Sequence, residues 1–155
     1  MKNLNFKPLM AIAILFSSFT FLSSFSSLPG GEGFEIYLNN KLVLQQFGTK
    51  MNDIKSISLS QAAAGDQVSI KYYHCGHVGK NRVVYIKNKA NTTLKEWKYK
   101  DVSQPVAAMS FHVSEVLQLR KSSNGLLGIY YSSSELPEGR LLAKVDINSK
   151  DVTSK

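Results

Sequence analysis

The sequence predicts an all-β protein, an antiparallel β-sandwich of about eight strands that follows a cleaved signal peptide. Short runs in which apolar and polar residues alternate recur along the chain, a pattern typical of strands with one buried face. Turn-forming residues separate these runs at intervals of roughly 8 to 12 residues, a spacing typical of sandwiches and barrels. The chain has one cysteine, so the cysteine pair of immunoglobulin domains is absent. Immunoglobulin-like and jelly-roll-like topologies therefore both stay open.

Residues 1–26 have the layout of a secretory signal peptide. Lys2 and Lys7 supply positive charge, Pro8–Leu22 is apolar and uncharged, and small residues precede a cleavage position at Ser27. An apolar run of about 15 residues is short for a bilayer, which takes about 20. We therefore expect an exported protein, secreted or periplasmic, whose mature chain has no membrane span.

The remainder divides into three parts. We expect a flexible N-terminal segment over 27–33, one β-sandwich domain over 34–148 and a polar tail over 149–155. A domain of this length can bury a hydrophobic core without disulfides.

The first strands are predicted as a hairpin. Phe34–Leu38 alternates between apolar and polar residues, and Lys41–Phe47 returns along it. Asn39 and Asn40 suit the turn between them, because asparagine tolerates positive φ. A further short strand is expected at Lys55–Leu59.

A second hairpin is predicted within Asp66–Lys89. Val68, Ile70 and Tyr72 alternate with more polar neighbours and mark one strand. Arg82–Lys87 is expected to return antiparallel to it after a glycine-containing loop at 76–81.

The C-terminal half continues the pattern. Leu94–Tyr99 and 106–113 alternate as strands, and one helical turn is expected from Ser114 to Leu119. Leu126–Tyr131 is apolar throughout, which is typical of a central strand buried on both faces. Leu141–Ile147 alternates again and predicts a last strand with one face in water.

Positive charge is concentrated in the middle of the chain. The net charge is +8, and residues 71–100 alone hold eight basic residues against the single acid Glu96. Such a patch attracts polyanions, for example acidic glycans or lipid phosphates. The alternative is that the lysines occupy solvent faces and edge strands, where they block edge-to-edge pairing. We expect no nucleic-acid partner, because no recognised binding motif is present.

One short stretch holds the only cysteine and two of the three histidines. Imidazole and thiolate together suit zinc or copper, so His74, Cys75, His77 and the distant His112 are candidate metal ligands. In a regular strand His74 and Cys75 point to opposite faces, and so do His74 and His77. A bulge at Gly76 is then needed to bring them together. The alternative is an inward, hydrogen-bonded His74 beside a buried or half-buried Cys75.

No complete catalytic set is present. Cys75 lacks an obvious orienting acid, since Asp66 is the only acid in its stretch. The chain also lacks a G-x-S-x-G elbow and a P-loop. We therefore expect a protein that is not an enzyme.

Aromatic and basic side chains in the central segment suggest a binding face. The tyrosine doublets 72–73 and 130–131 should each place one ring in the core and one on a sheet surface. The candidate face comprises Lys71, Tyr73, Arg82, Tyr85, Lys87, Lys95 and Trp97. The alternatives are cross-strand pairs that stabilise the sheet, and Trp97 as a core anchor.

These observations favour an exported, non-enzymatic binding or interaction module without a cofactor. Its partner would be an unknown protein, or an acidic glycan or envelope surface. The alternative is a small secreted metal-binding protein that holds zinc or copper through the His74–His77 stretch. In either case the sequence is compatible with a dimer, formed through the lone cysteine or through exposed edge strands.

Overall fold

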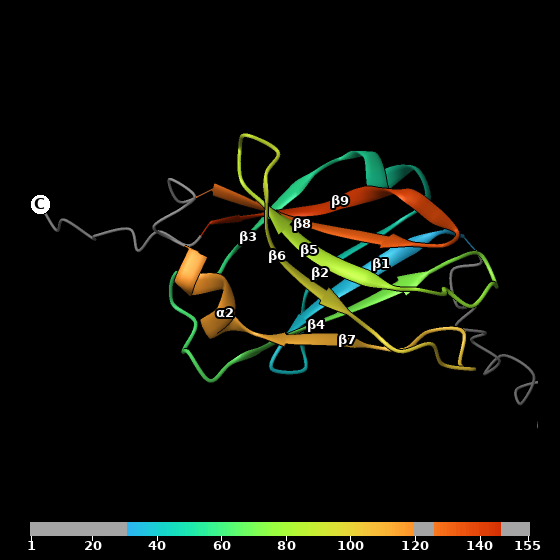
Figure 1. Ribbon diagram of the computed structural model, residues 1–155, viewed down its shortest axis with the longest axis horizontal. Helices are drawn as coiled ribbons and strands as arrows, with labels where there is room; N and C mark the ends of the chain where they lie inside the picture. Colours follow the sequence, from blue (N-terminus) through green and yellow to red (C-terminus); the bar gives the residue numbers. More distant parts are fainter. Residues whose placement is uncertain (1–30, 120–125, 147–155) are drawn as a thin grey trace, which may run out of the picture.

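The computed structural model describes residues 31–119 and 126–146. Within these ranges the chain is mostly β, with nine strands arranged in a four-stranded and a five-stranded sheet (Figure 1). The expected signal peptide at 1–26, most of the flexible segment at 27–33 and the polar tail at 149–155 lie outside the described residues. None of the described helices is long and apolar enough to cross a membrane.

The four-stranded sheet has the order β2-β1-β4-β7, and its neighbouring strands are antiparallel. Its strands are β1 (Gly33–Leu38), β2 (Lys41–Phe47), β4 (Gln67–Tyr73) and β7 (Met109–His112). The predicted β1–β2 hairpin is confirmed. Asn39 and Asn40 have φ values of 48° and 66°, which fits the left-handed turn that asparagine tolerates.

The five-stranded sheet has the order β3-β9-β8-β5-β6. Its strands are β3 (Lys55–Ser58), β5 (Val83–Lys87), β6 (Thr93–Lys98), β8 (Leu126–Ser133) and β9 (Leu136–Asp146). The expectation of a purely antiparallel protein is wrong at one pair, because β3 runs parallel to β9. The chain reaches β3 from the other sheet through the 3-10 helix η1 (Gly48–Asn52), so no hairpin sets its direction.

The predicted β4–β5 hairpin is also wrong. β4 pairs with β1 and β7, whereas β5 pairs with β6 and β8 in the other sheet. The chain turns sharply after β4 and crosses between the sheets before β5 begins. Alternation identifies each strand but does not identify its partner.

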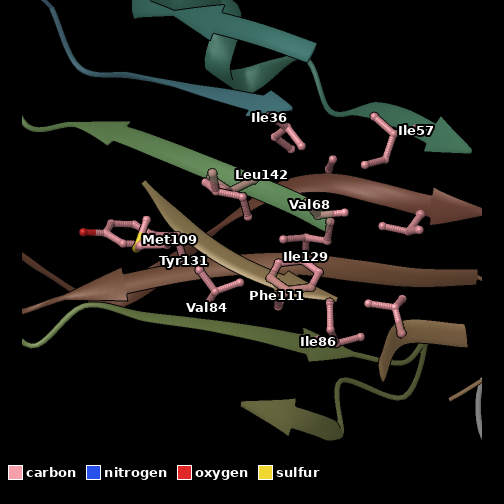
Figure 2. Close-up of a cluster of buried hydrophobic side chains, with 14 of the residues drawn as sticks. Ile36, Ile57, Val68, Val84, Ile86, Met109, Phe111, Ile129, Tyr131 and Leu142 are labelled. Carbon is pink, nitrogen blue, oxygen red and sulfur yellow. The ribbon is translucent and has the colours of Figure 1, made fainter. Parts of the chain in front are cut away.

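The two sheets pack face to face around a single core (Figure 2). The four-stranded sheet contributes Ile36, Val68, Met109 and Phe111, and the five-stranded sheet contributes Ile57, Val84, Ile86, Ile129, Tyr131 and Leu142. The alternation of the sequence places these side chains on the inner faces. β8 follows the same rule, since every second residue is buried. The expectation that β8 is buried on both faces is therefore wrong, because the residues on its outer face are only partly buried.

A short helix, α2 (Val113–Leu117), follows β7 and buries Val113 and Val116. It begins one residue before the predicted turn, because His112 is the N-cap and Glu115 accepts a hydrogen bond from the His112 N–H at 3.2 Å. His112 pairs with Gln67 at the start of β4. The helix therefore lies at one end of the sheets, and the turn that follows β4 lies at the other (Figure 1).

Candidate functional site

The four residues His74, Cys75, Gly76 and His77 form a tight turn after β4. The His77 N–H donates to the His74 carbonyl at 3.1 Å, and φ is positive at both Cys75 (51°) and Gly76 (89°). These values are typical of a two-residue type I′ turn. His74 and His77 are therefore cross-strand partners that share a face, whereas an uninterrupted strand would separate them. Cys75 lies exposed at the tip, so the expectation of a buried or half-buried thiol is wrong.

The side chain of His74 turns inward, as the alternative interpretation predicted. Its Nε2 lies 2.8 Å from the Tyr131 hydroxyl and 3.5 Å from the Ser133 hydroxyl. Its ring lies 4.8 Å from the ring of Tyr72, which stacks on Tyr131 across the two sheets at 4.3 Å. Burial lowers the pKa of His74 below its usual value, partly offset by Glu135 and Glu32. The neutral imidazole is therefore part of the packing between the sheets.

A cavity of about 340 Å³ lies beside this turn. Its lining consists of Glu32, His74, Cys75, His77, Glu135, Leu136 and Arg140. Most of the charged groups are already paired. Glu32 accepts hydrogen bonds from the Tyr72 hydroxyl and, at 3.2 Å, from Arg140.

Glu135, the second carboxylate of the cavity, accepts a hydrogen bond from the backbone. Burial alone would raise the pKa of Glu135, but hydrogen bonds, including one from the Lys80 N–H at 3.0 Å, hold it below its usual value. These groups form a polar network at this end of the core, in which the buried Nε of Arg140 has no hydrogen-bond partner among the described residues. Sequence reasoning missed Glu32, Glu135 and Arg140, because they come from segments far apart in the chain.

The four candidate metal ligands do not converge. His112 lies beside Gln67 at the opposite end of β4 from His74, and Cys75 points into solvent at the turn. Among the described residues, no group of three or more His, Cys, Asp or Glu side chains is placed to hold a metal ion.

The seven candidate face residues do not share one face. Tyr85 and Lys87 lie on the outer face of the five-stranded sheet, whereas Lys71 and Tyr73 lie on the outer face of the other sheet. Arg82, Lys95 and Trp97 turn toward the space between the sheets. The single basic-aromatic face expected from the sequence is therefore divided, because β4 and β5 belong to different sheets.

The inward-facing residues have structural contacts. Trp97 is a core anchor, because its ring stacks on Phe111 at 4.2 Å and its Nε1 donates to Glu115 at 3.1 Å. Lys95 forms an ion pair with the same Glu115 at 3.1 Å. Arg82 is 6% exposed and donates to the carbonyls of Ala107 and Lys100. Arg82 is buried, whereas the Lys95 side chain is 40% exposed and Trp97 is partly buried.

The outer face of the four-stranded sheet is organised around one acid. Glu35 accepts hydrogen bonds from the hydroxyls of Tyr37 at 2.7 Å and Tyr73 at 2.9 Å. Burial and this hydrogen bond raise the pKa of Tyr73 to about 12. The Lys71 Nζ lies 5.0 Å from the Tyr37 ring centroid. The polar groups of this face thus satisfy one another.

The outer face of the five-stranded sheet differs, because two tyrosines and a lysine stand together on it. Tyr85 and Tyr130 are paired residues of β5 and β8, and their rings lie 5.3 Å apart at an interplanar angle of 14°. The Lys87 Nζ lies over both, at 5.4 Å and 5.1 Å from their centroids. We call Tyr85, Tyr130 and Lys87 the tyrosine platform.

Two glycines let these rings lie against the sheet. A Cβ on Gly139 would overlap the Tyr85 hydroxyl, and a Cβ on Gly128 would lie 2.7 Å from a ring carbon of Tyr130. The ring of each tyrosine therefore occupies space that a side chain on β8 or β9 would otherwise fill. Sequence reasoning placed one ring of the 130–131 doublet on a surface but did not identify Tyr130 as the partner of Tyr85.

A hollow of about 150 Å³ adjoins the platform. It lies between the β5–β6 connection and the outer faces of β8 and β9. We call it the lysine hollow, and its lining is Asn88, Lys89, Asn91, Leu126, Leu127, Gly128, Tyr130, Leu141 and Lys144. The alternation of 141–147 predicted that Lys144 faces water, but only the register of β9 against β8 shows that it lies beside Gly128.

Compared with known proteins, the chain matches no family model and no curated sequence.

Proposed function

We propose that this protein is an exported, non-enzymatic β-sandwich module that binds an anionic partner through the outer face of its five-stranded sheet. The export follows from the signal-peptide pattern of residues 1–26. The β-sandwich architecture is favoured by two sheets that enclose one core.

The tyrosine platform is the observation that carries this proposal. Its two tyrosine rings lie against two glycines, and the Lys87 ammonium lies over both rings. Tyrosine offers a large, rigid contact area with a polar end, which suits it to binding surfaces. The adjoining lysine hollow adds Lys89 and Lys144, so positive charge and aromatic area occur together.

The outer face of the four-stranded sheet has a different distribution of charge. There Glu35 accepts from both tyrosine hydroxyls and lies across from Lys71 in the strand register. An acid at the centre of that face lowers its attraction for anions. The five-stranded sheet also has an acid on its outer face, since Glu96 pairs with Tyr85 in the strand register, but Glu96 is ion-paired with Lys98 at 3.2 Å. Lys87, Lys89 and Lys144 give this face the excess of positive charge that favours an anion.

The test is the affinity of the purified protein for two unlike polyanions, dextran sulfate and long-chain polyphosphate. We expect salt-sensitive binding of at least one, weakening from about 50 mM to about 500 mM salt because exposed charges are screened. The charge reversal Lys87→Glu should lower the affinity at low salt by about tenfold or more. The matched control is Lys71→Glu, which changes the net charge equally on the opposite face and should cost less than about threefold.

Two results would show that the tyrosine platform is not the anion-binding surface. One is unchanged low-salt affinity in Lys87→Glu. The other is an equal loss in Lys71→Glu, which would show that net charge alone drives the binding. If neither polymer binds, the proposed function itself is wrong.

A further inference from the structure

Four of the residues that line the lysine hollow have side chains that donate hydrogen bonds. Lys89, Lys144, Asn88 and Asn91, whose side chains carry ammonium and amide donors, are among its lining residues. Of the residues that the structure describes, no Asp or Glu lines it. A hollow with cationic donors and no carboxylate is complementary to an anionic group.

The orientation of both asparagine amides follows from their existing hydrogen bonds. Asn88 Oδ1 accepts from the Thr92 N–H at 3.0 Å, and Asn91 Oδ1 accepts from the Lys87 ammonium at 3.1 Å. Each of these bonds requires the carbonyl oxygen, because its partner can only donate. The NH₂ groups of Asn88 and Asn91 are therefore the ends left to donate to a ligand.

The loop that carries the asparagines is held by its own backbone. The Asn88 N–H donates to the Thr92 carbonyl at 3.1 Å, and the Asn91 N–H donates to the Asn88 carbonyl at 3.0 Å. Asn91 has a φ of 61°, which asparagine accepts more readily than most residues. A loop ordered before binding loses less conformational entropy when a ligand arrives.

The floor of the hollow is apolar and continuous with the platform. The ring of Tyr130 lies over Gly128, and Leu141 pairs with Tyr130 across β8 and β9. A pyranose ring carries C–H groups on its faces and polar groups on its rim, so it can pack on such a floor while its rim reaches the donors. A polyanion without a ring, such as polyphosphate, would use the lysines but leave the aromatic surface uncovered.

We propose that the anionic partner is an acidic polysaccharide whose pyranose ring packs on Tyr130 and whose carboxylate or sulfate enters the lysine hollow. This inference rests on the proposed function and specifies its partner. The hollow accommodates the charged end of one sugar, and the rest of the polymer continues over Tyr85 and Lys87.

The experiment measures the affinity of the purified protein for five polymers at low salt. Polygalacturonate and dextran sulfate carry carboxylates and sulfates on pyranose rings. Fully methyl-esterified polygalacturonate and plain dextran are their uncharged counterparts, and polyphosphate has charge without a ring. We expect an acidic polysaccharide to bind at least about tenfold more tightly than its neutral counterpart and than polyphosphate.

The variants assign that binding to the hollow. Lys144→Gln and Tyr130→Ala should each weaken the better acidic polysaccharide by about tenfold. Lys71→Gln removes the same charge on the outer face of the other sheet and should change affinity less than about twofold. Thermal unfolding of each variant shows that the fold is retained, and the charge variant Lys144→Gln keeps the test valid if Tyr130→Ala unfolds.

The failures of the two proposals are distinguishable. Equal binding of polyphosphate, or equal binding of a neutral counterpart, overturns the acidic-polysaccharide inference. The polyphosphate result leaves anion binding by the platform standing. If no charged polymer binds, both proposals fall together.

Discussion

At the residue scale, His74 links the pH of the solution to stability. Burial lowers its pKa, Glu135 and Glu32 raise it, and His77 and Arg82 lower it further. Because the unfolded chain binds this proton more readily, the free energy of unfolding should fall as pH drops below the ordinary histidine value of about 6.5. Above that value this contribution is fully present.

Chemical denaturation at about pH 7.5 and about pH 5 measures this effect, with a lower midpoint expected in acid. His74→Gln keeps a group that can hydrogen-bond Tyr131 but cannot titrate, so its dependence on pH should be weaker. His77→Gln, at the exposed partner position of the turn, should keep the original dependence. An unchanged pH dependence in His74→Gln would rule out this histidine as the source.

Cys75 occupies a backbone conformation that most side chains avoid. It is the first of the two central residues of the type I′ turn and has a φ of 51°. Asparagine is strongly preferred at this position when glycine follows. Cys75→Asn should therefore raise the free energy of unfolding by roughly 0.5–1 kcal/mol. Cys75→Ser is the control, since serine lacks the same tolerance. Equal stabilities of the two variants would show that the turn is not strained at this position.

At the scale of elements, Arg82 joins the segment between β6 and β7 to the start of β5. Its guanidinium donates to Ala107 O at 3.1 Å and to Lys100 O at 2.8 Å, and the residue is 6% exposed. Arg82→Ala leaves two carbonyls without these donors and should lower the free energy of unfolding by about 2–3 kcal/mol.

The same denaturation measurement on Lys98→Ala provides the comparison. Lys98 is exposed and pairs with Glu96 at 3.2 Å, and such surface pairs contribute less than about 1 kcal/mol. Similar small losses in both variants would mean that the Arg82 contacts contribute little to stability.

The strands themselves could be predicted far better than their partners. Asn39 and Asn40 mark a hairpin that the structure confirms, because the turn chemistry is local. The glycine-containing stretch after β4 suggested a second hairpin, yet β5 joins the other sheet. The parallel β3–β9 pair likewise joins segments distant in sequence. Such pairings depend on how the whole core is filled, which alternation does not encode.

At the scale of the whole molecule, the basic segment 71–100 is spread over both sheets and their edges. Lys95 and Lys98 lie on β6, an edge strand of the five-stranded sheet, which fits the alternative that lysines protect edges. Tyr85 and Lys87 could be predicted as surface residues from alternation alone. That Tyr130 and Lys144 lie near them could not be predicted, because it depends on the register of β8 with β5 and β9.

The most direct measurement of the central claim is a backbone amide chemical-shift map during titration with an acidic polysaccharide. We predict that the largest changes cluster at Tyr85, Lys87, Tyr130 and the loop with Asn88, with little change around Glu35 on the opposite face. A cluster around Glu35 and Tyr73, or around the turn at Cys75, would contradict the assignment of binding to the five-stranded sheet.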